Sequence, residues 1–390
     1  MGKNLLIWTT CLCGSGQLQS GRAVTVGVCL TMKIRRPAGL PVATEPCLKR
    51  KLSVGAVMDS PVTRLPGSSS GLEAASAALS VVTELTLRKD VQLSDYTRFG
   101  IGGPADLFAE TSSPAAFAQA TGLCRRQTLP VYVLGDGSNV IVSDEGFRGL
   151  ILRFIAKSLT REGDRIVADS GAPLESLVEF AVDAGLRGLE TLARIPGSVG
   201  AAVFGNAGAY GHSISERVEQ VEYFDGENIR TLDNAGCRFE YRGSVFKRHR
   251  DWLIFRTRFV LEPAGRDALR KKADEITAIR DEKFPPTMRC AGSIFKNLHV
   301  KDLPFEVAAR VPEGVIRDGK VASAYFLEKV GAKGMRKGGI EIASYHANLI
   351  YNTGNGTAAQ LREIIDELKN RIRERYGFEV EEEVQYVGEF

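Results

Sequence analysis

Histidine is scarce in this sequence, and no pair of histidines has the spacing of a metal site. The 390 residues contain four histidines, none of them in an H-x-x-x-H pattern. The seven cysteines form no C-x-x-C pair and have no neighbouring histidine that could complete a zinc site. We therefore expect no bound metal. Cys124, Cys237 and Cys290 stand far apart, which is typical of reduced thiols in the cytosol.

Long apolar runs and a strong net charge are also missing. The longest apolar runs fall well short of the roughly 20 residues that a membrane-spanning helix needs. Residues 1–84 carry nine basic and four acidic side chains, and the rest of the chain carries 42 and 43. A nearly neutral body gives no indication of a nucleic-acid partner. We expect a cytoplasmic monomer that binds neither membrane nor nucleic acid.

The first 84 residues differ from the rest in composition. They contain clusters such as Pro66–Gly71 and show no sustained helical or strand period. Leu5–Trp8 resembles a short signal, but the run is brief and no clear cleavage site follows it. We favour a disordered extension over residues 1–84, which could also reflect a true start at Met32 or Met58. A chain that starts near Val81 is accordingly expected to fold and remain active.

From Leu85 onward, helical and strand patterns alternate. A helix is expected at 114–126, capped by Ser112 or Ser113 and followed later by a helix at 174–184. Short β-branched runs fill 150–261. The remaining expected helices are 268–283, 323–330 and 358–376, and the expected strands are 105–110, 131–134, 140–142, 348–351 and 378–387. This mixture predicts an α+β protein.

Two glycine-rich motifs could bind a nucleotide. In Leu134–Val140, two glycines follow a strand, and successive backbone amides in such a turn can form an anion-binding concavity. Taken alone, this motif fits a pyrophosphate cradle and a plain tight turn equally well. Arg194–Gly211 has five glycines and little polar bulk, so a flat ligand could lie against its main chain. The alternative is a flexible linker, but Ile195 and Phe204 favour packing.

Three further motifs carry single candidate residues. Arg242 lies in an expected turn and could bind a carboxylate or phosphate, although a surface arginine is the simpler alternative. Ser293 follows Gly292 at an expected strand start, where a serine is most often structural. In the last strand, Glu381 and Glu383 should share one face and Glu382 the other, unless this is merely a solvent-facing edge.

Together and in this order, the motifs resemble the UDP-N-acetylenolpyruvoylglucosamine reductase family. The resemblance covers residues 85–388, and the short stretch from Lys283 to Ser293 is similar to the family's compact second type. The segments that carry it are Tyr96–Ala105, Leu134–Asn139, Ile195–Gly200, Asn206–Gly211, Tyr241–Ser244, Ala291–Asn297 and Glu381–Val384, with Lys333–Gly339 and His346–Leu349 also fitting.

The resemblance implies a two-part flavin domain of the FAD-binding type-2 (vanillyl-alcohol-oxidase, PCMH-like) fold and a C-terminal α+β substrate domain. The implied regions are 85–153, to which the strand at 378–390 returns, then 154–284, and finally 285–377. It also implies non-covalent FAD, NADPH as hydride donor, and reduction of an enolpyruvyl UDP-sugar to UDP-N-acetylmuramate. Two alternatives stay open: another FAD-linked oxidoreductase with a different substrate, and a nucleotide-binding regulator without catalysis.

The family's site residues map onto this chain through the same motifs. The resemblance implies that Ser293 donates a proton to C2 of the enolpyruvyl group, while Arg242 and Glu383 stabilise the intermediate; a slip to Glu381 would keep the same face. It assigns substrate binding to Tyr241, Lys283, Lys296 and Asn297. It assigns FAD binding to Gly135, Asp136, Gly137, Ser138, Asn139, Ile195, Pro196, Gly197, Ser198, Gly200, Ala201, Asn206, Gly208 and Ala209. Arg98 and Gly100 depart from the family pattern, which often has Asn or Thr and then Arg there.

Overall fold

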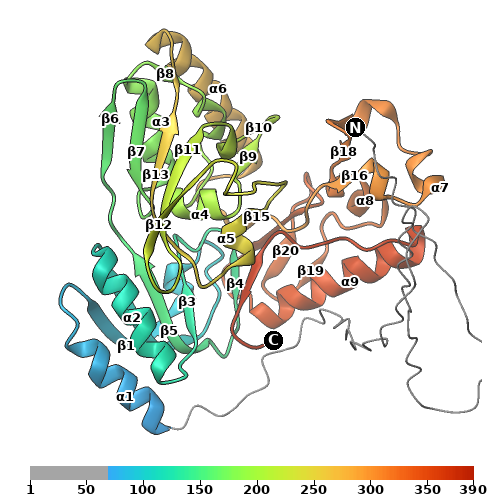
Figure 1. The fold of residues 1–390 in the computed structure, drawn as a ribbon. Helices are drawn as coiled ribbons and strands as arrows, with labels where there is room; N and C mark the ends of the chain where they lie inside the picture. Colours follow the sequence, from blue (N-terminus) through green and yellow to red (C-terminus); the bar gives the residue numbers. More distant parts are fainter. Residues whose placement is uncertain (1–68) are drawn as a thin grey trace, which may run out of the picture. The chain divides into compact units, whose positions relative to one another are not determined.

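The first described helix lies where we expected a disordered extension. The computed structural model describes residues 69–390, and α1 (Ser69–Ser80) opens this part (Figure 1). Ala75 and Leu79 of α1 are fully buried in a core that includes Phe117 of α2 (Pro114–Arg126). The expectation is therefore wrong for residues 69–84, because a short alanine-rich helix buries apolar side chains there. The expectation for residues 1–68 lies outside the described residues.

A four-stranded sheet follows α1, and both N-terminal helices pack against it. Its order is β1 (Thr86–Gln92), β2 (Pro104–Thr111), β5 (Phe147–Phe154) and β3 (Val131–Val133). The pair β1–β2 is antiparallel, and β2–β5 and β3–β5 are parallel. Ser113 caps α2 by accepting a hydrogen bond from the amide of Ala116 at 3.4 Å.

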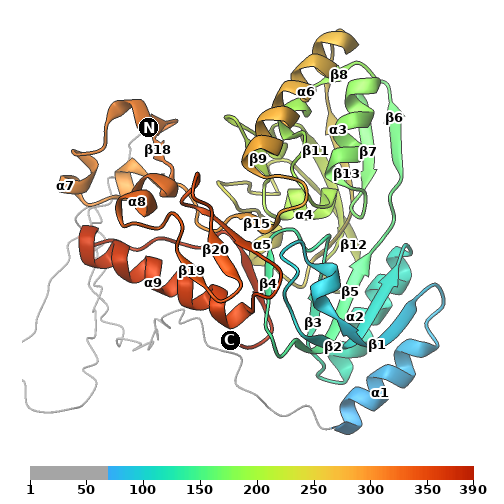
Figure 2. The same cartoon turned by 180° about the vertical axis from the view of Figure 1, so that it is seen from behind.

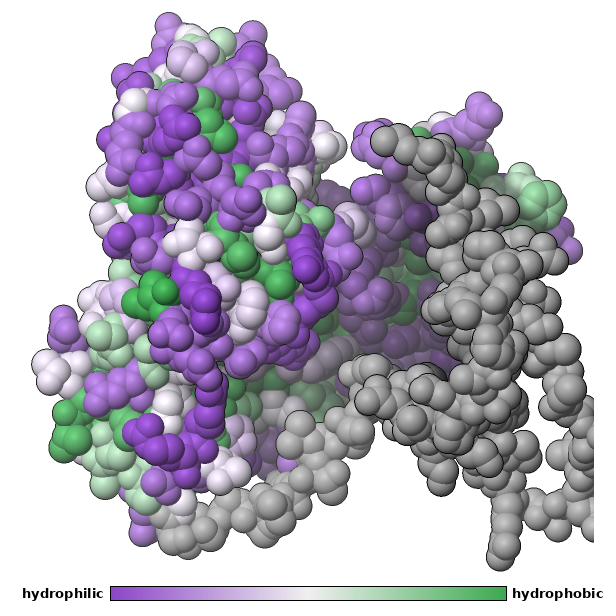
Figure 3. All heavy atoms as spheres, viewed as in Figure 1, coloured by the Kyte–Doolittle hydropathy of each residue, from purple (hydrophilic) through white to green (hydrophobic). Residues whose placement is uncertain are grey.

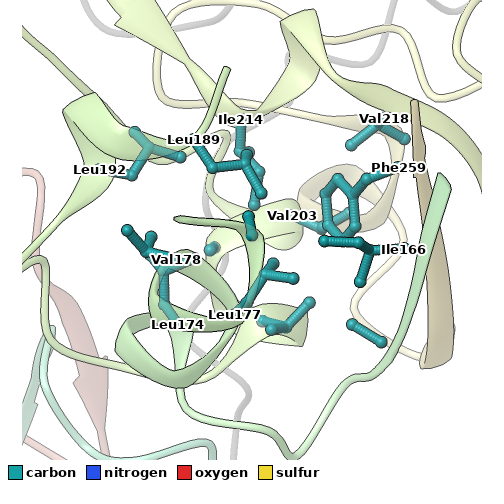
Figure 4. Packing of buried hydrophobic residues seen from close by; sticks show 14 of the residues in the cluster. Ile166, Leu174, Leu177, Val178, Leu189, Leu192, Val203, Ile214, Val218 and Phe259 are labelled. Carbon is teal, nitrogen blue, oxygen red and sulfur yellow. The ribbon is translucent and has the colours of Figure 1, made fainter. Parts of the chain in front are cut away.

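The second region is a five-stranded antiparallel sheet with helices on one face. The order is β12 (Ile229–Asp233), β11 (Val218–Phe224), β13 (Leu253–Val260), β7 (Arg165–Asp169) and β6 (Leu159–Glu162). Its core contains side chains of α3 (Leu174–Asp183), α4 (Val199–Phe204) and α6 (Arg266–Lys283). Figure 4 shows Leu177 and Val203 directed toward Ile166 and Phe259 of the sheet. β8 (Leu186–Arg187) and β14 (Glu262–Pro263) form a separate antiparallel pair.

The last region has its own core around two helices. Its sheet has the order β15 (Arg289–Ser293), β21 (Leu349–Asn352), β20 (Ile340–Ile342) and β19 (Arg336–Lys337), with α8 (Ser323–Lys329) and α9 (Ala358–Tyr376) contributing to the core. Asp144, from the first region, accepts hydrogen bonds from the amides of Ala358 and Ala359 at 2.8 and 3.0 Å. A carboxylate at the helix N-terminus satisfies amides that the helix leaves free.

The end of the chain departs from the expected strand. Only β22 (Gln385–Val387) is regular, and it pairs in parallel with β4 (Val140–Val142), so the chain returns to the first region. Residues 378–384 make a single bridge, Phe295 to Glu382, instead of the expected strand. The alternating pattern forms no regular strand there, and the acidic side chains contact separate basic partners, as with Lys369 Nζ and Glu382 Oε1 at 3.2 Å. The other helices and strands occur within a few residues of their expected bounds.

All described residues belong to one compact unit. Four larger hydrophobic clusters fill it: one in 166–276, one mostly in 291–384, and two in the first region, one of which includes Leu253 and Phe255 of β13. The boundaries at 153/154 and 284/285 stay predictions. Within residues 69–390, no helix has the length and apolar character required to cross a bilayer. Figure 2 shows the arrangement from behind.

Candidate functional site

A large cleft collects residues from all three regions. Its volume is about 1290 Å³, and its walls come from the segment around α4, the turn at 241–242, β15 and the hairpin of β17 (Ile316–Arg317) and β18 (Lys320–Val321). The space-filling view shows the surface hollowed between the two larger parts of the described chain (Figure 3). The expected site residues that line it are Ser138, Asn139, Ile195, Pro196, Gly197, Ser198, Ala201, Asn206, Gly208, Ala209, Tyr241, Arg242, Lys283, Ser293, Asn297 and Glu383.

The two glycine-rich motifs meet at one side of the cleft. Ser138 Oγ donates to the carbonyl oxygen of Pro196 at 3.2 Å, which joins the turn 135–139 to the segment before α4. Gly137 has a φ of 61°, and a Cβ there would clash with the carbonyl oxygen of Tyr96. The wall from 195 to 209 is mainly backbone and small side chains. Such a wall fits a large flat group like FAD, whose edges the main chain can reach.

Five expected site residues do not line this cleft. Asp136 lines a smaller neighbouring pocket of about 300 Å³ that also contains Arg98. Lys296 forms an ion pair with Glu381. A Cβ on Gly200 would come within 2.6 Å of Ser170 Cβ, so this glycine allows close packing. The remaining two are Gly135 and Gly137, whose missing side chains make room for other parts of the protein.

Arg242 lies in a strained turn that lines the cleft. Its φ of 56° costs a residue with a side chain about 1–2 kcal/mol. Its Nη1 donates to the carbonyl oxygen of Gly208 at 3.1 Å, and its Nε lies 2.7 Å from Oε1 of Glu383. Lys247 Nζ donates to the carbonyl oxygen of Arg242 at 2.9 Å. Asn206 and Tyr210 also line the cleft with positive φ, and such strain concentrates at functional sites.

Glu383 connects the glycine-rich turn to β15. Its amide donates to the carbonyl oxygen of Ile294 at 2.7 Å, and its carbonyl oxygen accepts from Asn139 Nδ2 at 3.2 Å. Its carboxylate is about one-fifth exposed, as is the guanidinium of Arg242. Of the three adjacent glutamates, Glu383 is the one that lines the cleft. Glu382 instead contacts Lys369 on α9.

Ser293 ends β15 with a free hydroxyl. The pairing of β15 with β21 shifts register between Cys290 and Ser293, and Gly292 has a φ of 78°. Bulges of this kind redirect side chains near active sites. Ser293 lines the cleft, and its hydroxyl donates to no other group within residues 69–390. It is therefore free to donate a proton or hydrogen bond to a ligand.

Burial perturbs several titratable groups around the cleft. Burial, and then the nearby charge of Lys283, lowers the pKa of His346 to about 4. Burial and then Arg280 lower the pKa of Lys283, and burial followed by Lys296 lowers that of Lys247. Burial raises the pKa of Tyr241, whose hydroxyl accepts from the amide of Asn297 at 3.2 Å. Clustered perturbation of this kind is typical of a functional site.

The cleft is more basic than the protein as a whole. Five cationic side chains and two carboxylates line it: Arg242, Arg280, Lys283, Arg317 and Lys320 against Asp318 and Glu383. The sequence did not identify four of these lining residues, Arg280, Arg317, Asp318 and Lys320. It did not identify Tyr210 and His346 either. Arg280 stands one helical turn before Lys283 on α6, a signal that could have been used. No comparable sequence signal marks Arg317 or Lys320.

Comparisons with known proteins agree with this arrangement. Residues 105–230 match the FAD binding domain model, and residues 284–387 match the model of the UDP-N-acetylenolpyruvoylglucosamine reductase C-terminal domain. The matches confirm the predicted fold class of a flavin domain followed by a C-terminal α+β domain.

Relatives of the same name cover nearly their full lengths. The UDP-N-acetylenolpyruvoylglucosamine reductase of Solibacter usitatus is 57% identical over 310 residues, 80% of this chain and 99% of the relative. That of Caldanaerobacter subterraneus subsp. tengcongensis is 32% identical over 79% of this chain and 96% of the relative. The crystal structure of the Thermus caldophilus reductase superimposes with a TM-score of 0.62 at 28% identity, covering 78% of this chain and 99% of the other. The chain belongs to the UDP-N-acetylenolpyruvoylglucosamine reductase family.

Proposed function

We propose that the cleft is the active site of an FAD-dependent reductase. With NADPH as donor, the enzyme converts enolpyruvyl UDP-N-acetylglucosamine to UDP-N-acetylmuramate in peptidoglycan synthesis. Family membership and the matched FAD binding domain support this activity. The observation that carries the assignment to the cleft is the convergence of Arg242, Glu383 and Ser293 beside a wall of main chain and small residues.

The residues present fit a bound flavin. The turn 135–139 and the segment 195–209 would hold FAD through backbone groups and small side chains. Bound FAD supplies hydride transfer from NADPH to the enolpyruvyl group. We infer non-covalent binding, because the turn contains neither cysteine nor histidine.

The three side chains Arg242, Glu383 and Ser293 have separate roles in the reduction of the sugar. Hydride addition at C3 places negative charge on C2 and the carboxylate, and a fixed guanidinium at Arg242 stabilises that charge without reorganisation. Glu383 holds the guanidinium in place through the 2.7 Å contact. Ser293 delivers the proton to C2, for which its free hydroxyl is suited.

The location, oligomeric state and partners of the enzyme are also part of the proposal. We infer that it acts in the cytoplasm as a monomer without nucleic acid or membrane. The 42 basic and 43 acidic side chains of residues 85–390 support the absence of a polyanionic partner.

Turnover with defined substrates tests the proposed function. Purified holoenzyme should oxidise NADPH only when the enolpyruvyl UDP-sugar is added, with UDP-N-acetylmuramate as product by mass spectrometry. Oxidation of NADPH with a different acceptor and none with this sugar would favour another FAD-linked oxidoreductase. A flavin-free protein that binds the sugar without turnover would favour a regulator.

A further inference from the structure

Four charged side chains of alternating sign form a chain that begins on one face of the first sheet. β2 and β5 pair Glu110 with Arg153, so both side chains lie on the same face. Arg153 Nη1 donates to Glu110 Oε1 at 2.9 Å, and Arg88 Nη2 donates to Glu110 Oε2 at 2.7 Å. The fourth member is Asp136, whose Oδ1 lies 3.6 Å from Nη2 of Arg153. The charges therefore follow the order Arg88, Glu110, Arg153, Asp136.

This chain of charges ends in the turn 135–139, which the proposed function assigns to FAD. Asp136 places a carboxylate in this turn, and its side chain is 38% exposed. The backbone amides of such a turn attract an anion, whereas a carboxylate repels one. Of the described residues, Arg153 alone forms an ion pair with Asp136. The negative charge that the turn presents to the diphosphate of FAD therefore depends on Arg153.

Neighbouring groups restrict the side chain of Arg153. Its guanidinium carbon lies 5.4 Å from the ring centroid of Tyr96, and that of Arg88 lies 5.5 Å from the same centroid. Arg88 Nη1 also donates to the hydroxyl of Tyr96 at 2.7 Å. A guanidinium held by a ring and a carboxylate loses little further freedom when it contacts a second carboxylate. The turn packs on Tyr96 as well, because a Cβ on Gly137 would come within 1.9 Å of its carbonyl oxygen.

We propose that Arg153 is a positioning residue for the cofactor. It neutralises Asp136 and holds the turn 135–139 in the form that accepts the diphosphate of FAD. The carboxylate of Asp136 then faces Arg153 and not the cofactor, so Asp136 contacts FAD through its backbone alone. The proposal rests on the proposed function for the placement of FAD at this turn.

The dissociation constant of FAD, measured by flavin fluorescence on dilution of the holoenzyme, tests the role of Arg153. Arg153→Met should raise this Kd about tenfold, because the carboxylate of Asp136 is then uncompensated beside the diphosphate. Asp136→Asn should leave the Kd within about threefold of wild type, and the double variant should recover most of the lost affinity. Arg153→Lys keeps the charge and should retain most of the affinity. The matched control is Arg258→Met, which breaks an exposed ion pair with Glu162 on the second sheet and should leave the Kd unchanged.

Two outcomes would overturn the proposal. An equal rise of the Kd in Arg153→Met and in the double variant would show that Arg153 only stabilises the fold. A large rise with Asp136→Asn alone would make the carboxylate a direct ligand of FAD, and this variant decides the question even if Arg153→Met does not fold. Melting temperatures close to that of wild type establish folding.

Gly137→Ala separates this proposal from the placement of FAD on which it rests. The added methyl group clashes with the carbonyl oxygen of Tyr96 and distorts the turn. If Gly137→Ala folds and keeps the wild-type Kd, FAD does not bind at this turn, and both the placement and the role of Arg153 fail. If Gly137→Ala loses FAD while Arg153→Met retains it, the placement stands and the positioning role is overturned.

Discussion

Arg242 adopts a left-handed backbone conformation that neighbouring groups hold in place. Gly208 and Glu383 contact its guanidinium, and Lys247 donates to its carbonyl oxygen. Lys247 sits on α5 (Val245–Arg248), whose first turn is capped by Ser244. The position of the guanidinium therefore depends on a lysine that does not line the cleft. Lys247 acts as a positioning residue in this account.

Lys247→Met should slow reduction of the sugar about tenfold, because a charged hydrogen bond to the turn is lost. Lys247→Arg should recover part of the rate. The measurement is the rate of flavin reoxidation by the enolpyruvyl sugar. Lys271→Met, an exposed lysine on α6, is the control. A rate unchanged from wild type would show that the turn needs no support from Lys247.

His346 gives a pH dependence of stability with a defined sign. Its pKa falls from 6.5 in the unfolded chain to about 4 in the fold, and its Nδ1 accepts from the amide of Asn348 at 3.2 Å. Between these values the unfolded chain binds the proton and the folded chain does not, so stability falls as pH falls from about 6.5 to about 4. His346→Gln should lose less stability than wild type between pH 7.5 and 5, measured by urea midpoints. Equal losses would contradict the assignment.

At the scale of elements, regular periodicity was the reliable signal. α2, α6 and α9 occur where apolar spacing and caps predict helices, and Thr357 and Gln360 form a capping box at α9. The sequence did not predict α1, because its many alanine and serine residues give no clear periodic pattern of apolar and polar side chains. Residues 378–384 have the pattern of a strand, but they form a single bridge to Phe295, and two of their glutamates form ion pairs with α9. The hairpin of β17 and β18 depends on the register of two-residue strands, which one sequence does not specify.

The buried face of α1 leads to a stability prediction. Leu79→Ala should destabilise the protein by about 2–4 kcal/mol, because Leu79 is fully buried in the core with Phe117. Val81, which is 81% exposed, provides the control: Val81→Ala should change stability by less than about 0.5 kcal/mol. Urea unfolding measures both. A chain that starts at Val81 should likewise be less stable than one that starts at Ser69, and equal stability would show that α1 contributes nothing.

At the scale of the whole molecule, the C-terminal segment connects the first region to the second and the last. Asn139 donates to the carbonyl oxygen of Glu383 and accepts from the amide of Gln385 at 3.0 Å. Glu383 in turn contacts Arg242 from the second region. The sequence motifs predicted the members of this group, but only the fold brings residues separated by more than a hundred positions into one cleft. Arg280, Arg317 and Lys320 enter the site through tertiary packing alone.

The central claim is that Ser293 protonates the sugar in a cleft where the flavin is reduced independently of that step. Ser293→Ala removes only the hydroxyl at the end of β15, so stopped-flow measurement of the two half-reactions is the most direct test. Flavin reduction by NADPH should proceed at close to the wild-type rate, and reoxidation by the enolpyruvyl sugar should slow at least about 100-fold. Equal slowing of both half-reactions, or no slowing of either, would contradict the account.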